Sequence, residues 1–196
     1  MARRKTEGRA DLILDSSLEL FAKHGFSKTT IADIAKAAEV ASGTIYLYYS
    51  SKEEILKACA QRFHTHHKNF VKSLLATDKG TSLKLREYLL NRHAVWEKET
   101  IGSTSGSDLA SVMISIAPEI TKAEQSLWLE TLRTLLKEGE TKNIYHFSSL
   151  TQELKIFLHC LTGFFPLPGI DHPFAPTKRD LVEAIDWFDK KWRVKT

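Results

Sequence analysis

The sequence predicts an all-α protein of about nine helices, in which a three-helix helix-turn-helix domain precedes a larger helical region. Apolar residues recur at intervals of three and four along most of the 196 residues. Three motifs, in which Ser or Thr precedes an acidic residue by three positions, mark helix starts. They are Thr30 to Asp33, Ser51 to Glu54 and Thr177 to Asp180. No segment has the pattern of a strand.

The first helix is expected from about Gly8 to His24. Leu12, Leu20 and Phe21 share one face of it. Gly25 follows directly, as glycine often does at a helix C-terminus. This helix would support the two short helices that come next.

Two short helices joined by a tight turn are expected between residues 29 and 49. The first begins at Thr29 or Thr30, and its apolar pattern breaks around Glu39. The second, residues 43–49, is only about two turns long, with small residues first and tyrosines after them. A helix of this kind can bring its N-terminal backbone close to a partner, as a recognition helix does at the DNA major groove.

This region resembles the helix-turn-helix of the tetracycline-repressor (TetR) family of bacterial transcription regulators. The matching segments begin at Ile13 and include residues 20–26, 29–35, 43–46 and 51–54. The order and spacing of these segments are specific to the family, although each one alone is common. The alternative is a generic helical hairpin with tyrosines in its core.

The resemblance implies which residues contact double-stranded DNA. The family's motif positions correspond to Thr30, Ala41, Gly43, Thr44, Tyr46, Tyr48 and Lys52. Thr30 and Lys52 would hold phosphates, Gly43 would allow close backbone approach, and the others would meet bases, methyl groups or phosphates. Two positions depart from the family: Ala41 often is serine there, and Glu39 often is glycine.

Basic residues near the N-terminus allow two interpretations. Arg3, Arg4, Lys5 and Arg9 could form an arm that follows phosphates or enters the minor groove. They could equally form a solvated tail.

A fourth, long helix is expected from Ser51 to about Leu75. His64 and His67 share a face of it, which makes a metal site conceivable, but no carboxylate or cysteine stands at ligand spacing. We therefore expect a solvated polar face around His64, His66 and His67. The later helices are expected at about Ser82–Glu99, Leu109–Ile116, Pro118–Glu138, Ser148–Phe164 and Thr177–Trp192, with Gly139 ending the third of these.

The middle helices carry side chains that suit a small-molecule pocket, which is mostly apolar and aromatic with a few polar groups. They are His93, Trp96, Met113, Trp128 and Phe164. Together they would bind a flat apolar or aromatic effector, with His93 as the polar group. Ordinary core packing explains each of them equally well.

The last two helices are apolar on two sides, which indicates either a sandwiched position or contact with another subunit. The resemblance implies a four-helix homodimer interface here, and the principal stripes carry Leu154, Phe157, Leu161, Leu181, Ile185 and Phe188. Ile156, Cys160, Gly163, Val182 and Trp187 form the second sides. The alternative is a monomer core.

Composition narrows the classes of protein. The net charge of +4 and the pI near 9.0 are compatible with nucleic acid. No apolar run suits a membrane span, the N-terminus does not resemble a signal peptide, and the two cysteines suggest a reducing cytoplasm. No phosphate loop, nucleophile elbow or ligand cluster indicates an enzyme or a cofactor.

We therefore expect a helix-turn-helix domain in residues 1–50 and a ligand-binding and dimerisation domain in residues 51–196. The expected function is a bacterial homodimeric repressor that binds a palindromic operator and is released by a small molecule. Two alternatives remain: a ligand-independent DNA-binding protein of the same fold, and a protein-interaction adaptor.

Overall fold

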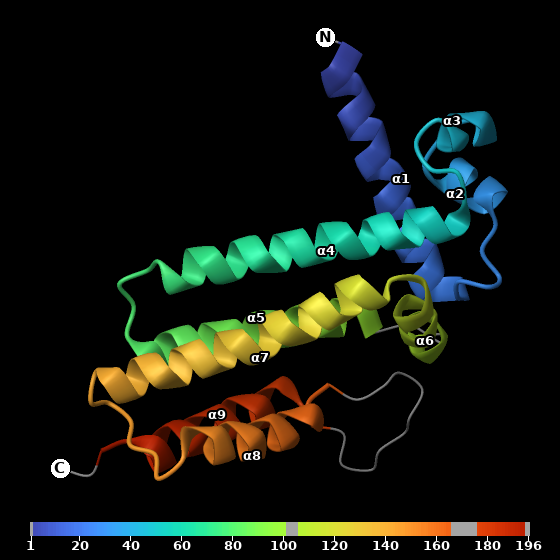
Figure 1. Ribbon diagram of the computed structural model, residues 1–196. Coiled ribbons are helices and arrows are strands. Elements are labelled where there is room, and N and C mark those ends of the chain that lie inside the picture. Colours follow the sequence, from blue (N-terminus) through green and yellow to red (C-terminus); the bar gives the residue numbers. More distant parts are fainter. Residues whose placement is uncertain (1, 101–105, 166–175, 195–196) are drawn as a thin grey trace. The chain divides into compact units, whose positions relative to one another are not determined.

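The computed structural model describes residues 2–100, 106–165 and 176–194, and within them the chain forms nine α-helices (Figure 1). They are α1 (Ala2–His24), α2 (Ile31–Ala37), α3 (Ser42–Tyr46), α4 (Lys52–Leu75), α5 (Thr81–Thr100), α6 (Gly106–Ile116), α7 (Pro118–Thr141), α8 (Leu150–Thr162) and α9 (Lys178–Trp192). The predicted all-α class is confirmed. None of the described helices has the length and apolar character that crossing a membrane requires.

Most helix bounds lie within a few residues of the prediction. The bounds of α1, α3 and α7 differ from it. Helix α1 begins at Ala2 rather than Gly8, so the segment interpreted as an arm or a tail is helical; the side chains of residues 2–7 lie outside the described part. Helix α3 ends at Tyr46, because the next residues form a tighter turn in which the Tyr48 amide bonds to the Ile45 carbonyl at 2.9 Å. Helix α7 continues past Gly139 to Thr141.

The chain divides into two compact units. Within the described residues, the first unit comprises 2–66, 99–100 and 106–123, and the second comprises 67–98, 124–165 and 176–194. The functional division into residues 1–50 and 51–196 stays a prediction.

The first unit is built around a core that joins α1, α2, α3 and the start of α4. Ile13, Phe21, Ile34, Ile45 and Ile55 are fully buried in it. One face of α6 packs against the same core through Leu109, Val112, Met113 and Ile116. The helix-turn-helix is therefore supported by α6 as well as by the helices next to it in the sequence.

The turn of the helix-turn-helix and the end of α1 both use left-handed backbone. Gly25 has φ 86° and donates its amide to the Phe21 carbonyl at 3.0 Å, so its predicted role in ending α1 is confirmed. Glu39 has φ 54° where the family often has glycine. A side chain there costs about 1–2 kcal/mol relative to the right-handed region.

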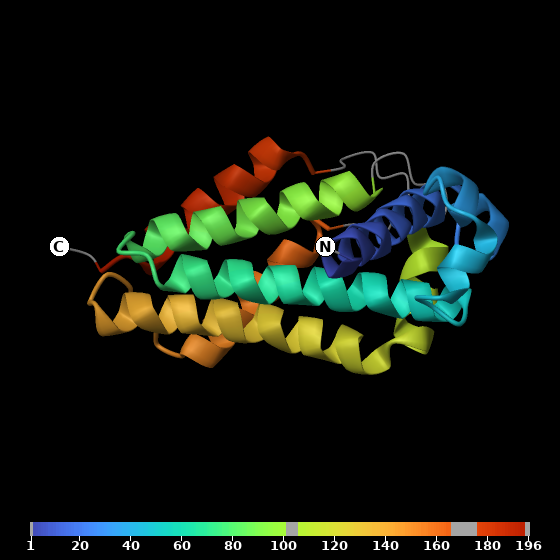
Figure 2. The same cartoon turned by 90° about the horizontal axis from the view of Figure 1, so that it is seen from above.

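The second unit has a core rich in aromatic rings, several of which lie on α8 and α9. The rings of Phe157 and Phe188 have centroids 4.7 Å apart, and Trp192 lies 4.9 Å from Phe157. Figures 1 and 2 show the second-unit parts of α4, α5 and α7 running side by side. Among the described residues, the one strand-like feature is an isolated antiparallel bridge between Tyr145 and Arg193.

Gly139 lies inside α7, where the prediction placed the end of the helix. A Cβ atom built on it would lie 2.1 Å from the Tyr145 ring. Tyr145 itself is 1% exposed, and its hydroxyl donates to Asp189 at 2.5 Å. Gly139 is therefore needed for the close approach of this ring, which explains a glycine in a helix without a break.

We predict that Gly139→Ala lowers the free energy of unfolding by about 1–3 kcal/mol, because the buried ring has to move. Gly8→Ala is the matched control: it is also helical, and nothing lies within 4 Å of a Cβ atom added to it. The control should be neutral or stabilising by up to about 1 kcal/mol. Urea unfolding of the three proteins measures both effects, and equal midpoints for Gly139→Ala and wild type would contradict the prediction.

Candidate functional site

The N-terminus of α2 is fixed by a capping box. The Thr30 side chain accepts from the Asp33 amide at 3.2 Å, and Asp33 accepts from the Thr30 amide at 2.9 Å and from its hydroxyl at 2.6 Å. These bonds, that of the hydroxyl first, hold the pKa of Asp33 below its ordinary value. The predicted box is confirmed, and Thr30 stays exposed at the start of the helix.

Helix α3 begins without a side-chain cap. Its N-cap is Ala41, and no side-chain hydrogen bond is made there, as the missing hydroxyl predicts. The next residue, Ser42, is exposed and supplies a hydroxyl one position later. Nothing lies within 4 Å of a Cβ atom built on Gly43, so a partner surface can approach the backbone there.

The outer face of α3 continues into two exposed apolar side chains. Tyr46 is 57% exposed and Leu47 is 82% exposed, whereas Ile45 between Thr44 and Tyr46 is fully buried. Tyr48 is half-buried and packs against the core of the first unit. Of the predicted contact residues, Tyr46 is therefore exposed and Thr44 is half-buried, and the structure adds Ser42 and Leu47 to the accessible face. No motif singled out these two.

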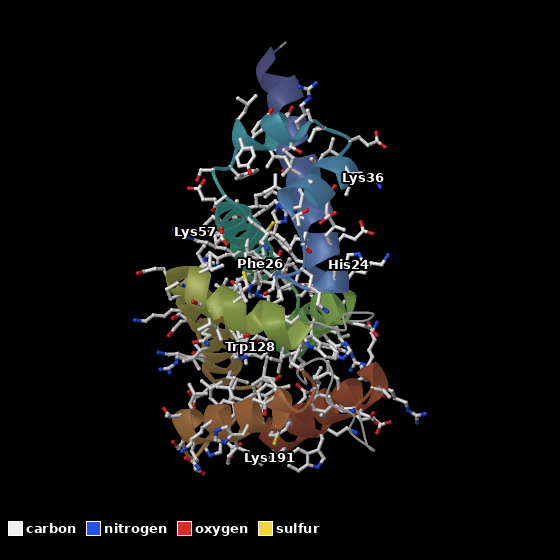
Figure 3. The ribbon with its side chains drawn as sticks, turned by 90° about the vertical axis from the view of Figure 1, so that its right-hand side faces the viewer. His24, Phe26, Lys36, Lys57, Trp128 and Lys191 are labelled. Carbon is white, nitrogen blue, oxygen red and sulfur yellow. The ribbon has the colours of Figure 1, made fainter. Side chains whose placement is uncertain are left out.

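Lys52 holds the loop between α1 and α2. Its ammonium group donates to the carbonyls of Phe26 at 2.7 Å and Thr29 at 2.8 Å. It also lies 4.4 Å from the centroid of the Phe26 ring, which Figure 3 labels. The Thr29 hydroxyl in turn donates to the Gly25 carbonyl at 2.8 Å. This residue, predicted to hold a phosphate, thus has a partner within the protein, and its phosphate contact stays a prediction.

The capping of α4 differs in one bond from the predicted box. The Glu54 amide donates to the Ser51 hydroxyl at 3.2 Å, as expected. The Glu54 carboxylate, however, accepts from the Ser50 amide at 2.8 Å rather than from Ser51. This bond holds the pKa of Glu54 below its ordinary value.

Three of the five residues predicted for an effector pocket come together in the second unit. The rings of His93 and Trp96 have centroids 5.4 Å apart, and Phe165 contacts His93, Trp96 and Trp128. Phe164, the predicted neighbour, packs against the core of the same unit. Met113 packs into the core of the first unit. The pocket itself stays a prediction.

A buried polar network lies beside these rings. The predicted exposure of one of its members, His67, was wrong. His67 was expected on a solvated face, but it is 6% exposed, and its Nδ1 lies 2.5 Å from Glu124. Arg92 donates to the same carboxylate at 3.1 Å and lies over the Trp128 ring at 5.2 Å. No metal-binding group of His, Cys, Asp or Glu side chains occurs within the described ranges.

The side chains named for a dimer interface belong to the core of one chain. All six are at most 4% exposed: Leu154, Phe157, Leu161, Leu181, Ile185 and Phe188. This assignment is corrected, because such side chains leave no surface for a second subunit. The second sides of the same helices do carry exposed apolar groups, with Ile156 39% and Trp187 60% exposed. Dimerisation itself stays a prediction.

Comparison with known proteins agrees with this geometry. Residues 13–59 match the family model described as bacterial regulatory proteins, tetR family. The HTH-type transcriptional regulator YvdT of Bacillus subtilis is 37% identical over 76 residues, which are 39% of each chain. The match therefore spans well under two thirds of that relative.

Solved structures extend the likeness to nearly the whole fold. The fatty acid degradation regulator FadR from Bacillus halodurans is 23% identical, with a TM-score of 0.65 over 93% of each chain. The protein in the SmeT–triclosan complex is 16% identical, with a TM-score of 0.69 over 96% of this chain and 93% of that one. At these identities the structures show a shared fold alone.

Fold and N-terminal motif thus define a helix-turn-helix protein with a helical C-terminal region. The predicted resemblance to the TetR family of transcription regulators is confirmed. The matching family model and the relative YvdT are both described as transcription regulators rather than enzymes.

We predict that Lys52→Met lowers the free energy of unfolding by about 1–3 kcal/mol, because two hydrogen bonds from a charged donor are lost. Lys57→Met, an exposed lysine on the same helix, should change it by no more than about 0.5 kcal/mol. Denaturant unfolding of both variants tests this. Equal stability of the two would show that the Lys52 bonds do not hold the loop.

Proposed function

We propose that this protein is a homodimeric transcription regulator that represses by binding a palindromic operator and is released by a small molecule. The observation that carries the proposal is the accessible face of α3, where an open backbone at Gly43 precedes the exposed side chains of Tyr46 and Leu47. Action in the bacterial cytoplasm follows from this role.

The face of α3 suits the major groove. Gly43 lets the helix backbone approach, and the hydroxyls of Ser42 and Thr44 can bond to phosphates or base edges. Tyr46 and Leu47 can contact thymine methyl groups, which the major groove exposes. Thr30 and Lys52 retain their proposed phosphate contacts at the starts of α2 and α4.

Two copies are needed because one short helix reads few base pairs. Two recognition helices related by a twofold axis, about 34–36 Å apart, read a palindrome. Ile156 and Trp187 are the exposed apolar groups of α8 and α9, and we place the interface on this side. It replaces the interface predicted from the principal stripes.

The cluster of rings around His93 supports the proposed release by a small molecule. An effector that binds one conformation better than another shifts their populations, with a coupling of typically about 1–3 kcal/mol. The complex of SmeT with triclosan is an example of an aromatic molecule on a similar fold. The effector would shift α4, the long helix that follows Ser51, and so change the spacing of the two recognition helices.

Two other functions make different predictions. A ligand-independent DNA-binding protein would hold its operator whatever small molecule is added. A protein-interaction adaptor would lack DNA affinity that falls steeply with salt. Footprinting on the region upstream of the protein's own gene, repeated over a salt series, separates the adaptor from both DNA-binding alternatives.

We predict that Leu47→Ala weakens specific DNA binding about tenfold, because a loss of about 1.4 kcal/mol of apolar contact corresponds to that factor. Leu83→Ala is the matched control, since Leu83 is also exposed, at 60%, but belongs to α5. Both variants should unfold at the wild-type midpoint. Fluorescence anisotropy with the footprinted fragment measures the affinities, and equal affinity of the two variants would remove Leu47 from the interface.

We predict that Trp187→Glu converts the dimer to a monomer, because a charge placed in an apolar interface is desolvated without a partner. Leu83→Glu tests whether any new charge on an exposed leucine of this unit has the same effect. Sedimentation at micromolar concentration reports the masses. A stable wild-type monomer would end the proposal of a dimer, and a dimeric Trp187→Glu variant would move the interface elsewhere.

A further inference from the structure

Phe165 lies among the residues predicted for the effector pocket, although the sequence analysis named its neighbour. Its ring centroid is 6.1 Å from His93, 6.2 Å from Trp96 and 5.7 Å from Trp128. It meets both tryptophans edge to face, at 85° and 79°. Edge-to-face packing is a favourable arrangement of two aromatic rings, so an aromatic ligand in the place of Phe165 could make the same contacts.

Phe165 is attached less firmly than the rings around it. His93, Trp96 and Trp128 stand on the long helices α5 and α7, whereas Phe165 follows the end of α8 at Thr162. Within the described part of the chain its amide donates to the Thr162 carbonyl at 3.2 Å, a turn bond. Its side chain is only partly buried. Moving this ring therefore disturbs no helix interior.

His93 has a polar atom that the described residues leave without a hydrogen bond. The side chain is 3% exposed, and its buried Nε2 has no hydrogen-bond partner in the described part of the chain. A buried polar atom that is left without a hydrogen bond loses its solvation without compensation, so a ligand that bonds to it gains affinity. Burial also lowers the pKa of His93, which favours the neutral imidazole. A neutral ring offers one nitrogen as donor and the other as acceptor.

The charges beside Trp128 are paired with one another, while Glu97 and Lys178 lie close enough to act on His93 with opposite signs. Arg92, which covers Trp128, is paired with Glu124 at 3.1 Å, and Glu124 also contacts His67. A charged ligand group here would have to compete with these pairs. The surroundings therefore favour an uncharged ligand with a single hydrogen-bonding group.

We infer that the Phe165 ring occupies the position of the effector, and that the effector is a flat, uncharged aromatic compound whose hydroxyl or similar group bonds to His93 Nε2. This inference rests on the proposed release by a small molecule. The effector displaces the ring, takes over its edge-to-face contacts with Trp96 and Trp128, and satisfies the buried nitrogen. Phe165 thus fills the site in the free chain.

Small probes test the site without DNA. Phe165→Ala removes a phenyl ring, and toluene and 4-methylphenol carry such a ring with one additional methyl group; cavities of this kind bind such molecules. We expect 4-methylphenol to bind this variant at least tenfold more tightly than wild type, measured by tryptophan fluorescence excited at 295 nm. Phe70→Ala is the matched control, because Phe70 is also partly buried against the core of this unit but belongs to α4, and it should show no gain.

A second substitution tests the hydrogen bond. In Phe165→Ala we expect 4-methylphenol to bind at least fivefold more tightly than toluene. Adding His93→Phe should abolish this preference while toluene still binds. A preference that persists without His93 would overturn the assignment of its nitrogen. Equal binding of 4-methylphenol to wild type and Phe165→Ala would overturn the displacement of the ring.

Phe165→Leu is a second variant, for use if Phe165→Ala does not fold. It keeps apolar volume but loses the aromatic edge, so an intermediate gain is expected if circular dichroism shows that the alanine variant is unfolded. No gain in a folded leucine variant would then overturn the inference. DNA release is measured separately: probe binding without release would contradict the proposed regulation and leave the site standing.

Discussion

The helix-turn-helix unit depends on the ammonium group of Lys52. The loop from Gly25 to Thr29 has few regular hydrogen bonds of its own, and buried carbonyl groups need donors. Lys52 supplies donors to two of these carbonyls and places its charge over the Phe26 ring. Because Thr29 directly precedes the cap of α2, the position of that helix follows from a side chain at the start of α4.

This arrangement shows why local signals predicted the fold well. A capping box joins residues three positions apart, so Thr30 with Asp33 and Thr177 with Asp180 could be identified without any tertiary information. The Glu54 carboxylate accepts from the amide of Ser50, one residue before the Ser51 amide that the predicted box uses. Such choices between neighbouring donors are decided by side-chain rotamers, which a sequence pattern does not contain.

Partners that are distant in the sequence could not be predicted in the same way. Periodicity shows that α8 and α9 have two apolar sides, but not which side the chain itself covers. Phe157 and Phe188 meet each other inside, while Ile156 and Trp187 remain exposed. His67 was likewise misjudged, since its partner Glu124 is 57 residues away. The contacts of Phe165 could not be predicted either, because its partner rings lie on α5 and α7, far from it in the sequence.

Several of the places where the chain breaks local rules coincide with the proposed sites, although Asn143 also has a positive φ and Leu83 is also exposed. Glu39 adopts a left-handed backbone at the turn before α3, Leu47 is 82% exposed beyond that helix, and His93 buries a nitrogen without a described partner. One exposed leucine is ordinary in any soluble domain, and one strained residue can be tolerated. Proteins that are locally consistent elsewhere tend to concentrate such costs where function requires them. Glu39 and Leu47 therefore support a binding face around α3. The buried nitrogen of His93 is a separate observation, and it supports a site among the aromatic rings of the second unit.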